Sequence, residues 1–104
     1  MKLIAEVYSL STRFPADERF GLTAQLRRAA VSVAANIVEG HARASKLEYR
    51  HFLSTARGST AEIEAELDIA QMLRYATRAN LETAREHADH VSRMLTNLRR
   101  SLSK

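Results

Sequence analysis

The fold is decided by the stretch from residue 80 to residue 102, NLETAREHADHVSRMLTNLRRSL. Its apolar residues recur at alternating steps of three and four: Leu81, Ala84, Ala88, Val91, Leu95, Leu98 and Leu102. Such a heptad-like seam is typical of an amphipathic helix that packs along one face in a bundle. The stretch therefore predicts a helix over about 80–102, with Asn80 as a candidate N-cap.

Three further helices are expected earlier in the chain, over about 2–13, 22–41 and 46–76. Phe14-Pro15 ends the first of them, because proline disfavours a helical conformation in the residue before it. The expected core stripes of the second and third helices are Leu22, Leu26, Ala29, Ala30, Val33 and Ile37, and Phe52, Leu53, Ala56, Thr60, Ile63, Leu67, Ala70 and Leu73.

Two local features shape the third helix. Ser45, followed three residues later by Glu48, forms an S-x-x-E capping box at its start. Gly58 lies inside the same helix, where glycine costs about 1 kcal/mol relative to alanine. We therefore expect close packing or a slight kink at Gly58.

Composition supports an all-α chain. The 104 residues include only 3 Gly and 1 Pro, which leaves few turns. Ala and Leu, both strong helix formers, together make up more than a quarter of the residues. Four helices with short connections predict one domain over 1–104, an up-down-up-down antiparallel four-helix bundle with a short first helix.

Several classes of protein are not expected. Cysteine is absent, so the chain has no disulfide and no thiolate ligand or nucleophile. No apolar run is long enough for a membrane helix, and the N-terminus lacks the pattern of a signal peptide, so a cytoplasmic protein is expected. Without a phosphate-binding glycine motif or a nucleophile beside a base, we expect no enzyme, no catalytic residue, no cofactor and no small-molecule substrate.

A metal centre receives one weak hint. Glu48 and His51 form an E-x-x-H pair, as found in di-iron four-helix bundles. Those sites need two such pairs plus a glutamate from each remaining helix, and this sequence has one pair. We therefore expect no metal site, and keep a metal-dependent enzyme as the weakest of three hypotheses.

Two helices have apolar residues on a second face. These residues are Ala24, Val31, Ala34 and Val38 in 22–41, and Ala65, Ile69, Met72 and Ala76 in 46–76. A bundle helix needs only one apolar face, so the second face suggests a partner, most simply another copy of the chain. The alternative is that these residues are scattered on the surface.

Charge is uneven along the chain. Arginine supplies 13 of the 16 positive residues, and the net charge is +4. Residues 59–70 are acidic and lie between two basic segments. Arginine forks suit phosphate groups, so a basic surface is a candidate for binding RNA. The candidate arginines and lysine are Arg27, Arg28, Arg43, Lys46, Arg50 and Arg57, with Arg93, Arg99 and Arg100 near the C-terminus.

A polar row follows one face of the second helix. It consists of Gln25, Arg28, Ser32, Asn36 and Glu39, with Arg27 off the row. One interpretation is a hydrogen-bonding strip for a ligand or RNA. The other is structural: Arg28 pairs with acids of the third helix, and Asn36 and Glu39 tie the turn between the helices. The candidate interaction surface is therefore Gln25, Arg27, Arg28, Ser32, Asn36, Glu39, Arg43, Arg50 and Arg57.

The order of short motifs resembles a known family. They are FP at 14–15, ERFGL at 18–22, QLRRAAVS at 25–32, NIVEG at 36–40, Arg43, and FL at 52–53 with ARGS at 56–59, followed by the acidic stretch 62–67. Together they resemble the four-helix bundle family of 23S rRNA intervening-sequence proteins over most of the chain, although the first helix here is shorter than is usual there.

The resemblance implies a bacterial cytosolic protein that assembles as a homopentamer. Some family members are encoded within intervening sequences of 23S rRNA genes, and a related branch comprises accessory proteins of diversity-generating retroelements that associate with nucleic acid. The resemblance implies no catalytic role for the matching residues, which are Gln25, Arg27, Arg28, Ser32, Asn36, Glu39, Gly40, Arg43, Arg57, Gly58 and Ser59.

The leading hypothesis is accordingly a non-enzymatic homo-oligomeric bundle, a pentamer, that binds RNA or a ribonucleoprotein through an arginine-rich surface. The alternative is a protein-interaction scaffold with no role in nucleic-acid binding.

Overall fold

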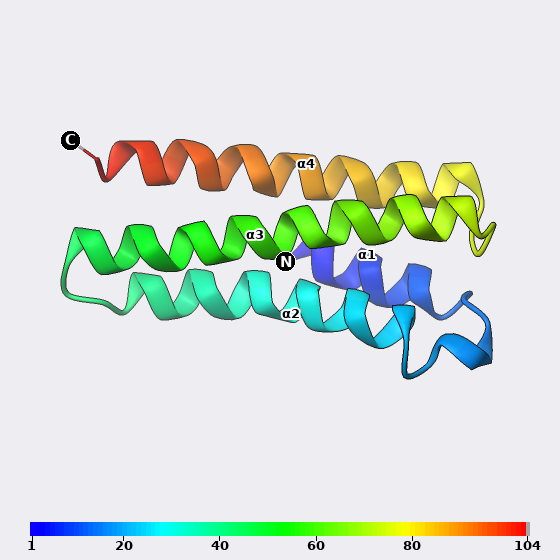
Figure 1. Cartoon of the computed structure of the whole chain (residues 1–104). Coiled ribbons are helices and arrows are strands. Elements are labelled where there is room, and N and C mark those ends of the chain that lie inside the picture. The colour runs from blue at the N-terminus through cyan, green and yellow to red at the C-terminus, as the bar shows by residue number, and fades with distance from the viewer. Residues whose placement is uncertain (104) are drawn as a thin grey trace.

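The structure, a computed structural model, describes residues 1–103 and consists there of four α-helices and one short 3-10 helix (Figure 1). The elements are α1 (Lys2–Ser11), η1 (Ala16–Glu18), α2 (Leu22–His41), α3 (Lys46–Met72) and α4 (Arg78–Ser101). Successive helices run in opposite directions and are joined by short connections. The predicted up-down-up-down bundle is confirmed.

Each helix packs mainly against two neighbours. α2 lies between α1 and α3, and α4 closes the ring by contacting α3 and α1. The molecule measures 44 × 23 × 18 Å, so it is an elongated bundle. Over residues 1–103, no helix combines the length and apolarity that a membrane crossing requires.

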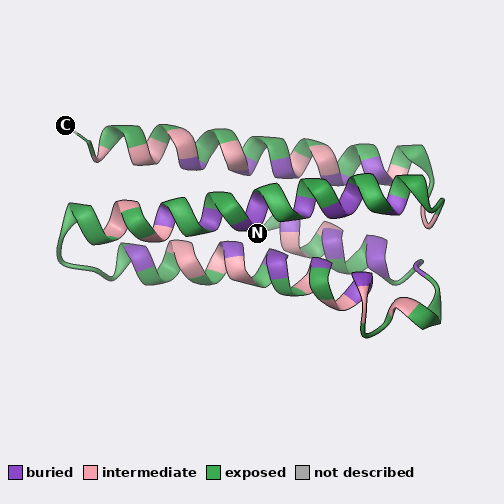
Figure 2. Cartoon of the chain, viewed as in Figure 1, coloured by how far each residue is buried: buried purple, intermediate pink, exposed green. Residues whose placement is uncertain are grey.

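The core lies along the centre of the bundle, where the buried stripes of the helices face one another (Figure 2). On α4 the predicted seam is buried from Leu81 to Leu95, and Leu98 and Leu102 pack against the core while partly exposed. On α2 the predicted stripe is buried up to Val33, with Ile37 half-buried. Periodicity alone therefore located the core on these two helices.

α1 is much shorter than its neighbours, as predicted. It has 10 residues, against 27 in α3, and it begins near the middle of the bundle (Figure 1). It covers the half of the molecule that holds the α3–α4 turn, and the other half consists of α2, α3 and α4 alone. The side chains of Tyr49 and Leu98 remain partly exposed.

α3 ends earlier than predicted, at Met72 instead of residue 76. Arg74 adopts a left-handed conformation with φ 59°, and the amide of Tyr75 donates to the carbonyl of Ala70 at 3.0 Å. This is the geometry of a helix C-terminal cap, which glycine usually supplies. Leu73 consequently leaves the stripe and is 49% exposed, so its assignment to the core was wrong.

The other helix ends differ by two residues or fewer. α1 ends at Ser11 instead of residue 13. α4 begins at Arg78, because the Thr77 side chain accepts from the amide of Asn80 at 3.2 Å. Thr77 is therefore the N-cap, and the expectation that Asn80 caps this helix was wrong. The Ser45 cap is confirmed: its hydroxyl accepts from the Glu48 amide at 3.1 Å.

Two glycines show where helices approach closely and where they do not. A Cβ on Gly40 would lie 2.9 Å from the Cβ of Phe52, so α2 and α3 approach closely there. A Cβ on Gly58 would meet nothing within 4 Å, and α3 runs through it without a break. The close packing expected at Gly58 is therefore wrong; it occurs at Gly40 instead.

Candidate functional site

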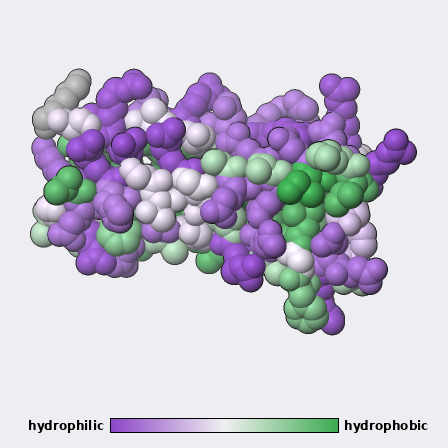
Figure 3. Space-filling model, in the orientation of Figure 1, coloured by the Kyte–Doolittle hydropathy of each residue, from purple (hydrophilic) through white to green (hydrophobic). Residues whose placement is uncertain are grey.

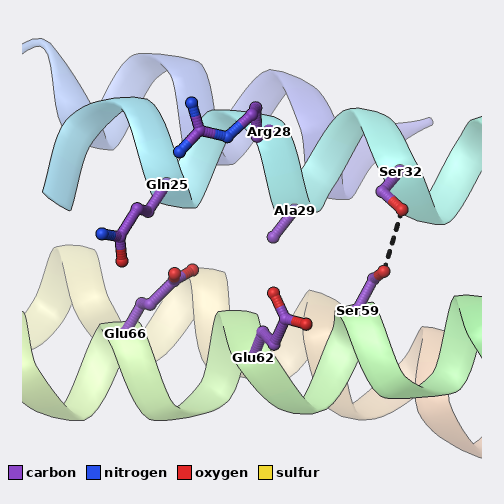
Figure 4. Close-up of a pocket in the computed structure, with 7 residues that line it drawn as sticks. All are labelled: Gln25, Arg28, Ala29, Ser32, Ser59, Glu62 and Glu66. Atoms are coloured by element: carbon purple, nitrogen blue, oxygen red, sulfur yellow. Dashed lines mark hydrogen bonds between the residues drawn. The ribbon is translucent and has the colours of Figure 1, made fainter. Parts of the chain in front are cut away.

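The polar row of α2 faces α3 and forms one side of a groove of about 390 Å³ (Figure 4). We call it the α2–α3 groove; its lining residues are Gln25, Arg28, Ala29 and Ser32 from α2, and Ser59, Glu62 and Glu66 from α3. The spacing of three and four residues on both helices places these side chains on the two facing surfaces. Three of the predicted surface residues thus come together in one place.

The end of this groove nearer the α2–α3 turn is closed by a small hydrogen-bonded cluster. The hydroxyls of Ser32 and Ser59 lie 2.9 Å apart and share a hydrogen bond between the helices. The side-chain amide of Asn36 donates to the Ser32 carbonyl at 2.8 Å and to its hydroxyl at 3.1 Å. Asn36 therefore supports Ser32 and is not a lining residue.

Glu66 is the most unusual residue of the groove. It is only 7% exposed, and its Oε1 has no hydrogen-bond partner among residues 1–103. Burial, and secondarily the nearby Glu62 carboxylate, raise the pKa of Glu66 to about 7, while Arg28 opposes this increase. At neutral pH the group is therefore divided between its charged and neutral forms.

Arg28 behaves differently from the structural interpretation of the polar row. That interpretation expected it to pair with acids of α3, but no ion pair involving Arg28 forms within the described part of the chain. Figure 4 shows its guanidinium turned away from Glu62 and Glu66. The residue is exposed and lies at the rim of the groove.

Arg27 lies outside this groove and joins α2 to α1. Its Nε donates to the Ser11 hydroxyl at 2.8 Å, and its guanidinium stacks over the Tyr8 ring at 4.8 Å from the centroid. The structure therefore places Arg27 in a helix–helix contact, separate from the other predicted surface residues.

Glu39 and Arg43 form an ion pair with each other near the α2–α3 turn. The Arg43 guanidinium also stacks over Phe52, 4.9 Å from the ring centroid. This ion pair near the turn agrees with the structural interpretation of the polar row for Glu39. Phe52, expected in the core, is half-buried beneath this stack.

Arg50 and Arg57 lie on another side of α3, facing α4. They border two adjoining hollows of about 210 and 340 Å³, which share Ser54 and Arg99. We call these hollows the α3–α4 groove; the complete lining is Leu47, Arg50, His51, Ser54, Arg57, Gly58, Ala61, Ser92 and Arg99. No acidic residue belongs to this set.

Two arginines of the α3–α4 groove have buried side-chain nitrogens without a partner in the described part of the chain. The Nε atoms of Arg50 and Arg99 are buried and have no hydrogen-bond partner in residues 1–103. Arg57 is exposed and lies two turns along α3 from Arg50. The nearest acids in sequence are Glu48 and Glu62 on α3 and Asp89 on α4. The charged side chains of residues 49–61, and those that follow Asp89, are all basic. The groove is therefore a local excess of positive charge.

Sequence reasoning did not place two residues, Glu66 and Arg99, in these grooves. Glu66 was counted with the acidic segment 59–70, although its seven-residue spacing from Ser59 places both on the side of α3 that faces α2. Arg99 was named only among the arginines near the C-terminus, because its position beside the same hollow as Arg50 depends on the register of α3 against α4. No cluster of three His, Cys, Asp or Glu able to hold a metal exists within residues 1–103.

Comparison with protein families matches residues 1–97 to the family of 23S rRNA-intervening sequence proteins. The chain belongs to this family. Membership of the 23S rRNA-intervening sequence proteins confirms the resemblance seen in the motifs from Phe14 to Leu67. The family description assigns no activity to its members.

A solved structure supports the fold of this 23S rRNA-intervening sequence protein. It is a crystal structure of a protein of unknown function from the S23 ribosomal protein family of Bacteroides thetaiotaomicron, with a TM-score of 0.80 and 22% sequence identity. The match covers 91% of this chain and 86% of that one. No curated protein matches the sequence.

Proposed function

We propose that this chain is a non-enzymatic homo-oligomer that binds RNA, alone or within a ribonucleoprotein, through the α3–α4 groove. The observation that carries the RNA-binding part is the pair of buried Nε atoms of Arg50 and Arg99, which find no partner within residues 1–103. Buried donors without acceptors are destabilising, and neighbouring guanidinium groups repel each other. A bound phosphate oxygen would accept hydrogen bonds from these donors, and its negative charge would reduce the repulsion between the guanidinium groups.

A nucleic-acid backbone suits this groove better than an isolated anion. Arg50, Arg57 and Arg99 are distributed over two adjoining hollows, so that successive phosphates can reach different guanidinium groups. Ser92 adds a hydroxyl donor between them, whereas the hydroxyl of Ser54 already donates to the Arg50 carbonyl at 3.0 Å. Arginine forks bind phosphate through two parallel hydrogen bonds, which gives contacts to the backbone without base specificity.

Self-association is supported by the second apolar faces. Val31 and Val38 on α2 are 47% and 70% exposed, and Ile69 and Met72 on α3 are 43% and 79% exposed. Figure 3 shows hydrophobic surface gathered at the end of the molecule that holds the α3–α4 turn, where α3 ends at Met72, whereas Val38 lies toward the opposite end, near the α2–α3 turn. Contiguous exposed apolar surface marks interaction sites in soluble proteins. A pentamer is the assembly that the family resemblance implies.

Fluorescence anisotropy with a labelled single-stranded RNA tests the RNA-binding proposal. We expect Arg50→Gln combined with Arg99→Gln to weaken binding by about tenfold or more near 100 mM salt, because two phosphate contacts are lost. A matched control is Arg13→Gln combined with Arg78→Gln, which removes two exposed charges outside the groove and should reduce affinity much less.

The alternative function, a protein-interaction scaffold without nucleic acid, makes the opposite prediction. In that case the wild-type chain does not bind RNA, or binds it with an affinity that the groove double variant and the Arg13→Gln, Arg78→Gln double variant change equally. Either result would refute RNA binding through the α3–α4 groove and favour the scaffold, for which the exposed Val38 and Met72 are the supporting observation.

A further inference from the structure

The α2–α3 groove contains a buried carboxylate oxygen that accepts no hydrogen bond from the described residues. Glu66 is 7% exposed, and its Oε1 has no partner among residues 1–103. Figure 4 shows its carboxylate extending from α3 toward α2, into the groove. A buried carboxylate oxygen that has lost its water costs free energy unless a donor replaces that water.

The surroundings of Glu66 provide acceptors and little positive charge. Glu62, one turn earlier on α3, brings a second carboxylate to the same groove, and Ser32 and Ser59 bring two hydroxyl oxygens. The one positive residue in the lining, Arg28, forms no ion pair with either acid, and its guanidinium turns away from them. Two carboxylates in one groove disfavour an anionic ligand and favour a cation.

We propose that the α2–α3 groove binds a guanidinium group, which enters between Gln25 and Ser32 and donates hydrogen bonds to Glu66 and Glu62. A guanidinium carries five N–H donors in one plane, so it can serve several acceptors at once, whereas a metal ion would find only two carboxylates. The groove, of about 390 Å³, has room for the group and its alkyl stem, and Ala29 leaves its floor open.

Two sources can supply this chemistry. One is a small free compound that carries a guanidinium group. The other is an arginine side chain of a second copy, since the chain has 13 arginines and exposed apolar side chains such as Val31 lie on α2 as well. The second source rests on the self-association proposed above, and the first does not depend on it.

The test uses agmatine, a small guanidinium compound, titrated into the full chain by isothermal calorimetry. We expect wild type to bind agmatine and Glu66→Gln to bind at least about tenfold more weakly, because one charge-assisted contact is lost. The matched control is Glu64→Gln, which makes the same charge change on an exposed position of α3 outside the groove. It should bind as wild type does.

Sedimentation with and without agmatine distinguishes the sources. If a second copy supplies the arginine, agmatine lowers the mass of the wild-type assembly and Glu66→Gln lowers it without agmatine. If the ligand is free, agmatine binds and the mass does not change. A monomeric wild type that still binds agmatine would refute self-association while supporting the groove.

Two results would overturn the proposal. One is agmatine binding that is equal in wild type and Glu66→Gln. The other is a wild type that neither binds agmatine nor changes mass with it, while Glu66→Gln matches wild type in both measurements. In either case the carboxylate of Glu66 receives no guanidinium, for instance because Arg28 reaches it in solution.

Discussion

At the scale of single residues, Glu66 is the acid whose charge the fold accommodates least well. Its pKa is about 7 in the folded protein, against an ordinary value of 4.5. Between these values the folded state holds more protons than the unfolded state, so the free energy of unfolding falls as pH rises from about 4.5 to about 7. Above about pH 7 the titration of Glu66 lowers the free energy of unfolding no further.

Glu66→Gln should therefore raise stability at alkaline pH. We expect a gain on the order of 2 kcal/mol at pH 8 relative to wild type, because a raised pKa of this size penalises the buried charge. Near pH 4.5 the difference should be small. Urea denaturation at both pH values measures it, with Glu64→Gln as the control. A variant whose stability falls with pH as steeply as that of wild type would refute the role assigned to Glu66.

Residue contacts explain why the candidate sites were only partly predictable. The row Gln25, Arg28 and Ser32 follows from helical spacing, and the structure confirms that its members share one face. The contact of Arg27 with Tyr8 could not be seen in that spacing, because it joins residues on different helices whose register the sequence does not state. The same limit applies to Arg50 and Arg99.

At the scale of helices, Gly40 and Gly58 differ in what their missing side chains permit. At Gly40 an added methyl group would meet Phe52 and Tyr49 at 2.9 and 3.0 Å, where α2 passes α3. At Gly58 it would meet open space. Glycine is therefore required at the first position by packing and at the second by nothing in the monomer.

Alanine substitutions at these two glycines should have opposite effects. Gly40→Ala is expected to cost about 1–3 kcal/mol, because the neighbouring helix must move. Gly58→Ala is expected to gain about 1 kcal/mol through better helix propensity. Thermal denaturation followed by circular dichroism measures both. Destabilisation by both substitutions would show that Gly58 is also a site of close approach.

Helix boundaries were predictable where a side chain marks them. The Ser45 hydroxyl accepts a hydrogen bond from the Glu48 amide, and α3 begins where this capping box predicted. The end of α3 was not predictable, because Arg74 takes the left-handed conformation that glycine usually marks. For α4, Thr77 and Asn80 are both good cap residues, and the local pattern could not choose between them.

At the scale of the whole molecule, the charges and the apolar residues divide the surface. The acidic segment 59–70 contributes Glu62 and Glu66 to the α2–α3 groove, whereas the α3–α4 groove is lined by arginine. Ion pairs such as Arg85 with Asp68, at 2.7 Å between α3 and α4, use part of the arginine excess within the bundle. The remaining arginines carry the net positive charge.

Assembly should depend on the exposed apolar face of α3. We expect sedimentation of the wild type at micromolar concentration to give a mass well above the 11.7 kDa of one chain. Met72→Glu, at a position 79% exposed, should lower that mass while leaving the helix content unchanged, because a charge is then buried at the interface. The exposed Thr83→Glu on α4 is the control. A wild type that sediments as a monomer would contradict the proposed oligomer.

Crosslinking shows directly whether RNA binds in the α3–α4 groove. A 4-thiouridine RNA is irradiated with the wild-type protein, and the linked peptides are identified by mass spectrometry. We predict crosslinks within residues 49–61 of α3 and 90–102 at the end of α4, which flank Arg50 and Arg99. Crosslinks confined to α1 and α2, or none at an RNA concentration that saturates the protein, would contradict it.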